Sequence, residues 1–312
     1  ILSGLVGSEM CIRDSLNNEN HSSYEQQMGM RGKKFWQDEE LKKFPHNPTA
    51  ADIAIRDLEM IENPALTAKF QQKFNELNKG DYSRSKHKNR IANISAFEVL
   101  NFNSNYRVLE LGNPLNTART SYLHKSIGGY SAVKVKRTQE MIDRYFQSNY
   151  TILTSALNSG NISNMQNMHF FNMLHTKYII LDLNASGVVG KPSQKAEEKP
   201  GVLPNPFALG NAWTVNNVKW VNNADEEIAS FEDPDFNPKN TAVIDVRYKD
   251  LVDESLDLSG GTLKLLEYQP NYLKYGSNST GHALAVFSEI FHDKGWKAFI
   301  NGKEVPHFRV NY

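Results

Sequence analysis

Cysteine is nearly missing from this 312-residue sequence, which contains Cys11 alone. A single thiol cannot close an intrachain disulfide or supply a cysteine-based metal site, so a disulfide-stabilised scaffold and a zinc ribbon are both excluded. The nine histidines do not fall at metal-ligand spacing either. The sequence therefore predicts no metal and no cofactor.

The sequence also lacks net charge and long apolar runs. Its 35 basic residues balance 35 acidic ones, so no overall field favours a nucleic-acid partner. The mean hydropathy is -0.55, and no stretch approaches the roughly 20 apolar residues that a membrane helix needs. The remaining composition, 39% hydrophobic and 22% charged, is ordinary for a globular chain with room for about two domains.

The first 47 residues differ from the rest. Residues 1–15, ILSGLVGSEMCIRDS, are too short in their apolar part and too poor in basic residues for a signal peptide, and they resemble adapter-derived translation at the ends of metagenomic reading frames. We therefore leave them out of the fold prediction, and Cys11 with them. Residues 16–47 are polar and weakly patterned, which predicts an extended lead-in.

Residues 48–250 are expected to form a helix-rich α/β domain with a small central sheet. Thr49 is the predicted N-cap of a helix, with Asp52 in a capping-box position, and Pro64 opens a second helix. A buried strand is predicted from Tyr106, and residues 184–204 have the composition of a surface loop.

Residues 251–312 contain short strand-like runs separated by turns, which predicts an antiparallel, β-sandwich-like domain and an α+β fold class overall. Asn301-Gly302 favours a tight hairpin, because both residues tolerate positive φ. Phe308 to Tyr312 reads as a strand without a following partner, so we expect this domain to be incomplete at its C-terminus.

The loop and helix after the Tyr106 strand are the strongest candidate site. Five Lys/Arg residues and no acid lie between Arg119 and Arg137, together with a glycine pair, as a site for an anionic headgroup would require. An aromatic ring could lie under a sugar while the cations hold its phosphate; the alternative is a basic helix face paired with acids or near anionic lipid. The candidate ligand-binding residues are His124, Lys125, Gly128, Gly129, Tyr130, Lys134 and Arg137.

Other motifs have weaker interpretations. His124 could act as a catalytic base or as a polar contact. Trp213 and Trp296 could form a sugar platform with nearby tyrosines, although aromatic residues on strands more often belong to the core. Asp233-Pro234-Asp235 begins like a calcium loop, but Pro238 and Ile244 stand where glycine and glutamate are required, which leaves an Asx turn.

Two family resemblances compete for the same stretch. Val108 to Gly112 looks like the first motif of S-adenosylmethionine methyltransferases, but Asn113-Pro114 follow where further glycines are expected. The stronger resemblance is to the extracytoplasmic region of the YfhO family of bacterial integral membrane proteins, in the form found in Bacteroidetes-like bacteria. It covers most of residues 45–312, with matching segments NFNSNYRVLELGNPLNTARTSYLHKSIGGYSAVKVKRTQEMID, MLHTKYII, PNPFALGNAW, the stretch from Tyr268 to Tyr275 and the stretch from Ala283 to Tyr312.

This resemblance implies a fragment on the periplasmic side of a cell membrane, with the membrane helices outside it. The family is similar to type-C glycosyltransferases, which move sugars from polyprenyl-phosphate carriers to cell-envelope glycopolymers. Their catalytic acid sits on a loop that has no counterpart here, so we assign no catalytic residue and expect the fragment alone to be inactive. His175 and Thr214 depart from the family pattern, where asparagine and an aromatic residue are expected. The alternative is a non-catalytic carbohydrate-binding or cell-envelope structural module.

Overall fold

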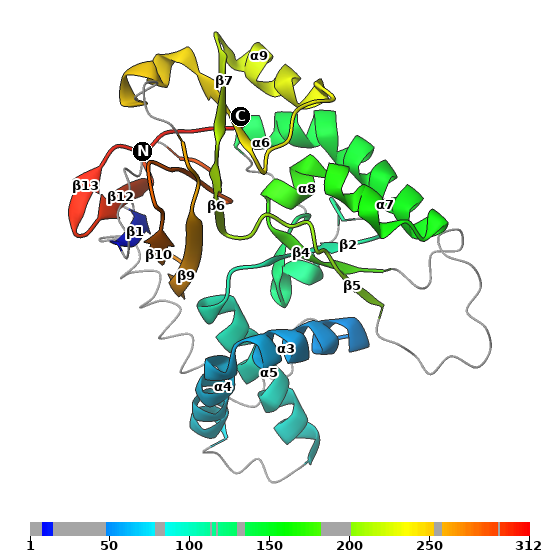
Figure 1. The fold of residues 1–312 in the computed structure, drawn as a ribbon. Helices are drawn as coiled ribbons and strands as arrows, with labels where there is room; N and C mark the ends of the chain where they lie inside the picture. Colours follow the sequence, from blue (N-terminus) through cyan, green and yellow to red (C-terminus); the bar gives the residue numbers. More distant parts are fainter. Residues whose placement is uncertain are drawn as a thin grey trace. The chain divides into compact units, whose positions relative to one another are not determined.

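The computed structural model describes residues 8–14, 48–78, 85–112, 114–116, 118–129, 135–181, 201–252, 258–292 and 294–312. The predicted α+β class is confirmed (Figure 1). The chain forms two compact units: the helical unit comprises residues 16–130 and 178–204, and the sheet unit comprises residues 1–15, 131–177 and 205–312. The lead-in predicted for residues 16–47 and most of the loop predicted for residues 184–204 lie outside the described residues.

Three helices build most of the helical unit. They are α3 (Ala50–Glu62), α4 (Pro64–Leu77) and α5 (Ser85–Asn103). The predicted capping box is present, since the Asp52 amide donates to Thr49 Oγ1 at 3.3 Å and the Thr49 amide donates to Asp52 Oδ2 at 2.7 Å. Pro64 occupies the first turn of α4, where its missing N–H has no helical partner to lose.

A small sheet completes the helical unit, in the order β3-β2-β4-β5. Its strands are β2 (Arg107–Glu110), β3 (Lys125–Ser126), β4 (Thr176–Ile180, of which Tyr178 onward belongs to this unit) and β5 (Val202–Pro204), with the 3₁₀ turn η2 (Thr120–Tyr122) before β3. β2 runs parallel to β3, and β4 antiparallel to β5. Ile55 of α3 packs with Tyr106, Val108 and Tyr178, so the helix and sheet share one core.

The sheet unit begins its helical part with one long helix that contains a wider π turn. The helical segments are α6 (Lys136–Met141), η3 (Ile142–Phe146), α7 (Gln147–Ser159), η4 (Ile162–Asn167), α8 (His169–Met173), α9 (Ala224–Ala229), η5 (Ser230–Glu232) and η6 (Val246–Leu251). The segments η4 and α8 are separated at Met168, whose ψ of 60° interrupts helical geometry.

The strands of this unit form a five-stranded sheet in the order β13-β12-β1-β10-β9 and two strand pairs, β6 with β11 and β7 with β8. They are β1 (Ser8–Asp14), β6 (Ala212–Val215), β7 (Asn217–Val221), β8 (Thr241–Asp245), β9 (Thr262–Gln269), β10 (Tyr272–Asn278), β11 (Leu284–Phe287), β12 (Trp296–Ile300) and β13 (Lys303–Val305).

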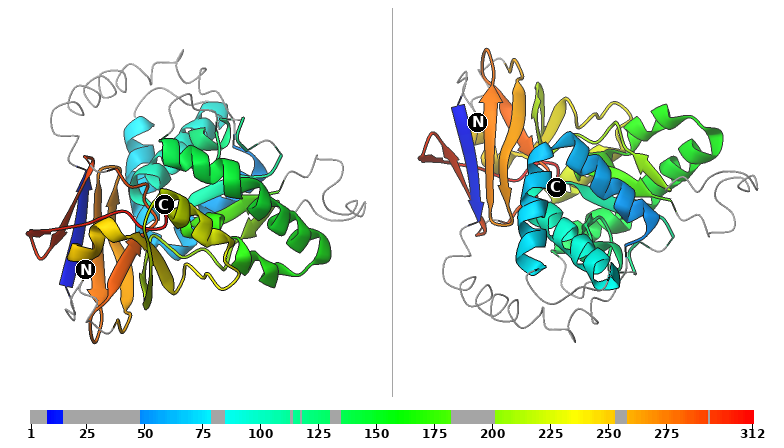
Figure 2. Two further views of the ribbon diagram at one scale, coloured as in Figure 1. Left: turned by 90° about the horizontal axis from the view of Figure 1, so that it is seen from above. Right: turned by 90° about the horizontal axis from the view of Figure 1, so that it is seen from below.

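Strand β1 belongs to the segment that the sequence analysis left out of the fold. It lies between the β9–β10 hairpin and the β12–β13 hairpin and pairs antiparallel with β10 and β12 (Figure 2). This strand is part of the fold because its backbone groups supply hydrogen-bonding partners to one edge of each hairpin. The strand does not test whether residues 1–15 derive from an adapter, so that origin stays a prediction.

The division between the units differs from the boundary predicted near residue 250. β6 pairs with β11, so residues on both sides of that position share a sheet. Val215, Ile244 and Leu284 also share one buried cluster. Long-range strand pairing, which local composition does not reveal, therefore sets the boundaries.

Asn301 and Gly302 have φ of 51° and 80°, as the predicted hairpin between β12 and β13 requires. The strand predicted for Phe308 to Tyr312 is wrong. Asn311 and Tyr312 have positive φ, which breaks extended geometry. Instead, the Asn311 side chain and amide bond to the Val243 backbone at 2.8 and 3.0 Å, which fixes this segment beside β8.

The shared core of the helical unit predicts that Ile55→Ala lowers the free energy of unfolding by about 2–5 kcal/mol, because Ile55 is fully buried and the change leaves a cavity. Leu58→Ala on the same helix is the control; Leu58 is 37% exposed and should cost less than about 1 kcal/mol. Urea unfolding of both variants measures the difference, and equal losses would contradict the assigned core.

Candidate functional site

The structure divides the predicted headgroup site between the two units. His124, Lys125, Gly128 and Gly129 belong to the helical unit, and Arg137 belongs to the sheet unit. Tyr130 and Lys134 lie outside the described residues. Neither unit by itself therefore brings the predicted set together, and each part needs its own account.

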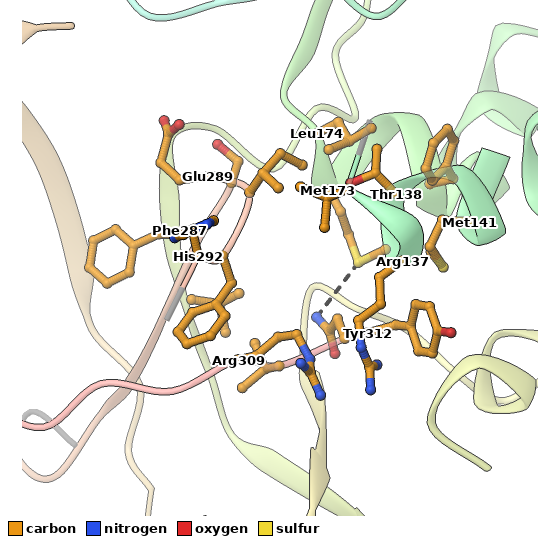
Figure 3. Close-up of a pocket in the computed structure, with 18 of the residues that line it drawn as sticks. Arg137, Thr138, Met141, Met173, Leu174, Phe287, Glu289, His292, Arg309 and Tyr312 are labelled. Carbon is orange, nitrogen blue, oxygen red and sulfur yellow. Dashed lines mark hydrogen bonds between the residues drawn. The ribbon is translucent and has the colours of Figure 1, made fainter. Parts of the chain in front are cut away.

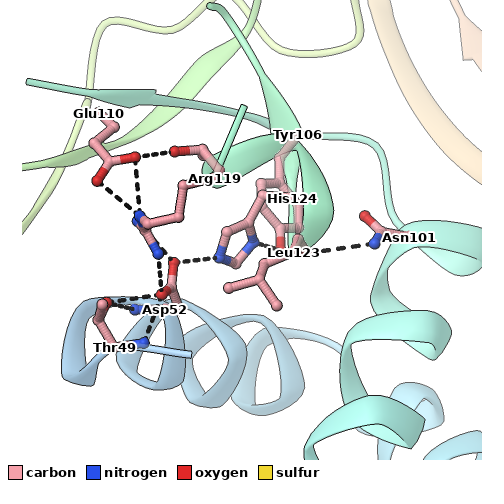
Figure 4. A network of polar contacts seen from close by, with 9 residues as sticks. Thr49, Asp52, Asn101, Tyr106, Glu110, Arg119, Leu123 and His124 are labelled. Carbon is pink, nitrogen blue, oxygen red and sulfur yellow. Dashed lines mark hydrogen bonds and ion pairs between the residues drawn. The ribbon is translucent and has the colours of Figure 1, made fainter. Parts of the chain in front are cut away.

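His124 is part of a buried polar network in the helical unit (Figure 4). Its Nε2 lies 3.3 Å from Asp52 Oδ1, and its Nδ1 lies 3.0 Å from the Tyr106 hydroxyl. Arg119 bridges two carboxylates, with Nη1 at 2.7 Å from Asp52 Oδ2 and Nε at 2.9 Å from Glu110 Oε1. The network joins α3 to the strand β2 and to the turn before β3.

The charges of this network are fixed by its surroundings. Burial raises the pKa of Asp52, but hydrogen bonds from His124, Arg119 and Thr49 outweigh burial and hold it well below its usual 3.8. The pKa of the Tyr106 hydroxyl is raised well above its usual value by burial and by nearby carboxylates. Asp52 is therefore charged and Tyr106 neutral at physiological pH.

The network contains side chains of the kinds that act as general acids and bases, but a substrate cannot reach them. His124 is 2% exposed and Asp52 is fully buried. The His124 ring also packs edge-on against Phe97, with centroids 5.3 Å apart. A general base must reach the proton that it removes. We therefore interpret this network as a structural joint, and the role of His124 as a polar contact within it.

Lys125 and the glycine pair also have structural roles. Lys125 Nζ donates to the backbone oxygens of Asn101 and Ser104, which cap the end of α5. A Cβ on Gly128 would lie 1.8 Å from the Pro114 oxygen, so only glycine fits there. The Gly129 amide donates to the same oxygen at 2.7 Å. The two glycines thus hold the turn after β2 in place through close contacts with the Pro114 backbone.

Arg137 lines a cavity of about 540 Å³ in the sheet unit, which we call the cationic cavity (Figure 3). Its walls come from α6, α8, the end of β11 and the C-terminal segment. The residues that matter for its chemistry are Arg137, Arg247, Arg309, Tyr312, Trp213, Met173, Glu289 and His292.

Two of these arginines share one carboxylate. Glu227 is fully buried, and its Oε2 lies 3.1 Å from Arg137 Nη1 and 3.5 Å from Arg309 Nη2. Its other oxygen accepts from the Tyr312 amide at 2.7 Å. Arg309 Nε and Nη2 are buried and have no hydrogen-bond partner among the described residues. Two guanidinium groups thus share this one buried carboxylate directly, while Asp245 acts electrostatically on Arg309 and Glu140 on Arg137.

An aromatic ring lies beside these cations. The Arg137 guanidinium carbon is 4.3 Å from the centroid of the Tyr312 ring, a cation–π distance. Figure 3 shows the guanidinium groups of Arg137 and Arg309 directed to the same side of the cavity, next to Tyr312. Arg247 is already paired with Asp245 at 2.5 Å and adds less free charge.

The two tryptophans of the predicted sugar platform do not line the same cavity. Trp213 contributes to the cationic cavity, and its Nε1 donates to the Pro238 oxygen at 2.9 Å. Trp296 instead lines a mainly apolar groove and packs against the cluster around Leu273 and Tyr275. The two tryptophans therefore do not form one platform, and each could contact a ligand only in its own cavity.

The predicted Asx turn is present, since Asp233 Oδ1 accepts from the Asp235 amide at 3.0 Å. Among the described residues, no cluster of three His, Cys, Asp or Glu side chains could hold a metal ion. No helix in the described part of the chain is long and apolar enough to cross a bilayer.

Comparison with known proteins adds no identification, since no family model, curated protein or solved structure matches this chain. Sequence reasoning missed Arg309 and Glu227 as site residues. Arg309 lay in an expected strand, and Glu227 lies in the first turn of α9, where acidic residues are common because they suit the helix dipole. Their pairing is a tertiary contact that no local pattern indicates.

The buried network predicts a pH-dependent effect of Asp52→Asn. Near neutral pH the substitution should lower the free energy of unfolding by about 3 kcal/mol, because it leaves Arg119 with one carboxylate instead of two. The folded pKa of Asp52 lies below its usual 3.8, so its contribution is complete above that value and is lost as pH falls below it. The wild-type and variant stabilities should therefore converge in acid.

Urea unfolding near neutral pH and at about pH 3 measures this convergence. Asp57→Asn is the matched control, because Asp57 is on the same helix and its exposed pair with Arg56 should contribute less than about 1 kcal/mol. A loss that is the same at both pH values would show that Asp52 does not carry its charge as described.

Proposed function

We propose that this chain is the extracytoplasmic part of a YfhO-like membrane protein, and that its cationic cavity binds the phosphate-bearing end of a polyprenyl-phosphate-linked sugar. In this role the chain assists transfer of the sugar to a cell-envelope glycopolymer. It orients the carrier and leaves the chemistry to the membrane part of the parent protein. The family in this proposal comes from the sequence resemblance, and the class of ligand comes from the residues that line the cavity.

The observation that carries the proposal is the pair of guanidinium groups that share the buried Glu227 carboxylate. Arg137 and Arg309 both approach this one carboxylate, and two nitrogens of Arg309 remain without hydrogen bonds in the described part of the chain. A buried cation is costly unless it is paired. A phosphate oxygen in the cavity would give these cations a second anionic partner, and guanidinium groups suit phosphate because they donate two parallel bonds.

The remaining walls suit the rest of such a ligand. The volume of about 540 Å³ lies in the range of small-molecule sites. Met141, Met173 and Phe287 offer apolar surface, while Tyr312 and Trp213 offer aromatic surface for a sugar ring or an isoprenoid carbon. This combination of cations and aromatics is the one expected for a lipid-linked sugar phosphate.

The second candidate is a non-catalytic carbohydrate-binding or cell-envelope structural module. Two acids near the cavity favour it: Glu227 is held by two arginines and Asp245 by Arg247. A carboxylate fixed in ion pairs is a poor general acid. The two candidates differ in whether the phosphate is required for binding.

Calorimetric titration of the full chain with a water-soluble short-chain polyprenyl-phosphate sugar separates them. Arg309→Gln and Arg137→Gln should each weaken binding by roughly tenfold or more, since each removes a charge-assisted hydrogen bond to phosphate. Inorganic phosphate should compete. The phosphate-free sugar should bind far more weakly to this cavity.

Arg144→Gln is the matched control, because Arg144 is on the same helical stretch but pairs with exposed Glu232 outside the cavity. Thermal melting should show that all three variants remain folded. Equal affinity for the phosphorylated and phosphate-free sugars would favour the structural module, and no binding of either would refute the headgroup site.

A further inference from the structure

A second cleft in the sheet unit has a different chemistry. Its volume is about 720 Å³, and three segments enclose it: the end of η4 with the start of α8, the chain before β6, and the loop between η5 and β8. The side chains that set its chemistry are Gln166, Asn167, His169, Phe207, Trp213 and Asp235. We call it the amide cleft.

The amide cleft carries almost no net charge. Its charged side chains are Asp235 and Lys239, of opposite sign, and it contains no arginine. Burial lowers the pKa of His169, so this imidazole is neutral at physiological pH. A phosphate therefore gains little here, in contrast to the cationic cavity.

The polar groups of the cleft can both donate and accept hydrogen bonds. The side chains of Gln166 and Asn167 and the carboxylate of Asp235 have no partner among the described residues, and all three are exposed. An amide offers a carbonyl acceptor beside an NH₂ donor. This is the pattern that matches hydroxyl groups, which also donate and accept.

Phe207 and Trp213 contribute aromatic surface to the apolar part of the lining, which also includes Phe236, Leu209 and three prolines. Small-molecule sites combine such apolar surface with a few polar groups that fix orientation. A sugar ring presents apolar C–H faces and polar hydroxyl edges, so it needs both kinds of wall.

A buried asparagine pair holds two walls of the cleft in place. Asn205 Nδ2 donates to Asn172 Oδ1 at 2.9 Å, and both side chains are at most 5% exposed. Asn172 Nδ2 donates to the Met165 oxygen at 2.9 Å, while Asn205 Oδ1 accepts from the Phe207 amide at 3.1 Å. The Leu209 backbone amide donates to the Asn172 backbone oxygen at 3.0 Å. The cleft is thus preorganised before any ligand enters.

We propose that the amide cleft binds an uncharged carbohydrate, at a position separate from the phosphate-binding groups of the cationic cavity. Its exposed amides hold the hydroxyl groups, and Phe207 and Trp213 pack against the ring. Trp213 also lines the cationic cavity, so this one residue contributes to the walls of both cavities. This site does not depend on the proposed lipid headgroup, because the groups that bind the sugar are different.

The test uses the full chain and a panel of neutral oligosaccharides built from glucose, mannose or N-acetylglucosamine, with binding followed by saturation-transfer NMR and calorimetry. At least one member should bind saturably. The double variant Gln166→Ala/Asn167→Ala should weaken that binding by roughly tenfold. Both side chains are exposed, so the variant should keep the wild-type melting temperature.

Arg309→Gln is the matched control, because it changes the cationic cavity and leaves the cleft intact. It should leave neutral-sugar binding unchanged and weaken only the phosphorylated ligand. If no member of the panel binds, or if the double variant binds as tightly as the wild type, the carbohydrate cleft is refuted. Failure of the phosphorylated ligand alone would refute the headgroup site and leave this one standing.

Discussion

The buried carboxylate of Glu227 is the constraint on which the sheet unit's candidate site depends. It is fully removed from water, and such a charge is tolerated only when it is paired and hydrogen-bonded. Its partners come from distant parts of the sequence: Arg137 at the start of α6, and Arg309 and the Tyr312 amide in the C-terminal segment. The carboxylate therefore fixes the walls of the cationic cavity and sets its charge.

The helical unit uses the same device. Asp52 is equally buried, but Arg119, His124 and Thr49 surround it, and Arg119 reaches Glu110 as well. Here one guanidinium faces two carboxylates, the reverse of the ratio around Glu227. A cation that bridges two carboxylates joins elements together, whereas two cations that share one carboxylate keep hydrogen-bond donors that an anion can use. This contrast is why we place the headgroup at Arg309 and not at His124.

The parts of the fold that the sequence predicted are those in which one short segment determines its own geometry. The capping box at Thr49, the helix start at Pro64, the Asx turn at Asp233 and the Asn301-Gly302 hairpin all depend on residues a few positions apart. The failures are tertiary. Phe308 to Tyr312 alternates like a strand, yet its backbone bonds to Val243 decide its course. In the basic loop, Lys125 and Gly129 bond to the backbone of their own unit, which the local pattern did not indicate.

The two cavities of the sheet unit differ in the property that decides what each can hold. In the cationic cavity, desolvated guanidinium groups make an anion the favoured ligand. Exchange of that anion for a neutral group would leave Arg309 with Glu227 as its ion-pair partner and with buried nitrogens that lack hydrogen bonds among the described residues. In the amide cleft, exposed amides can return to water when the ligand leaves, so binding there is reversible and weak per contact. A carrier phosphate needs to be held firmly, and a growing neutral glycan needs to be released and shifted. The distribution of charge between the two cavities supports that proposed division of tasks, with Trp213 as a wall that both cavities share.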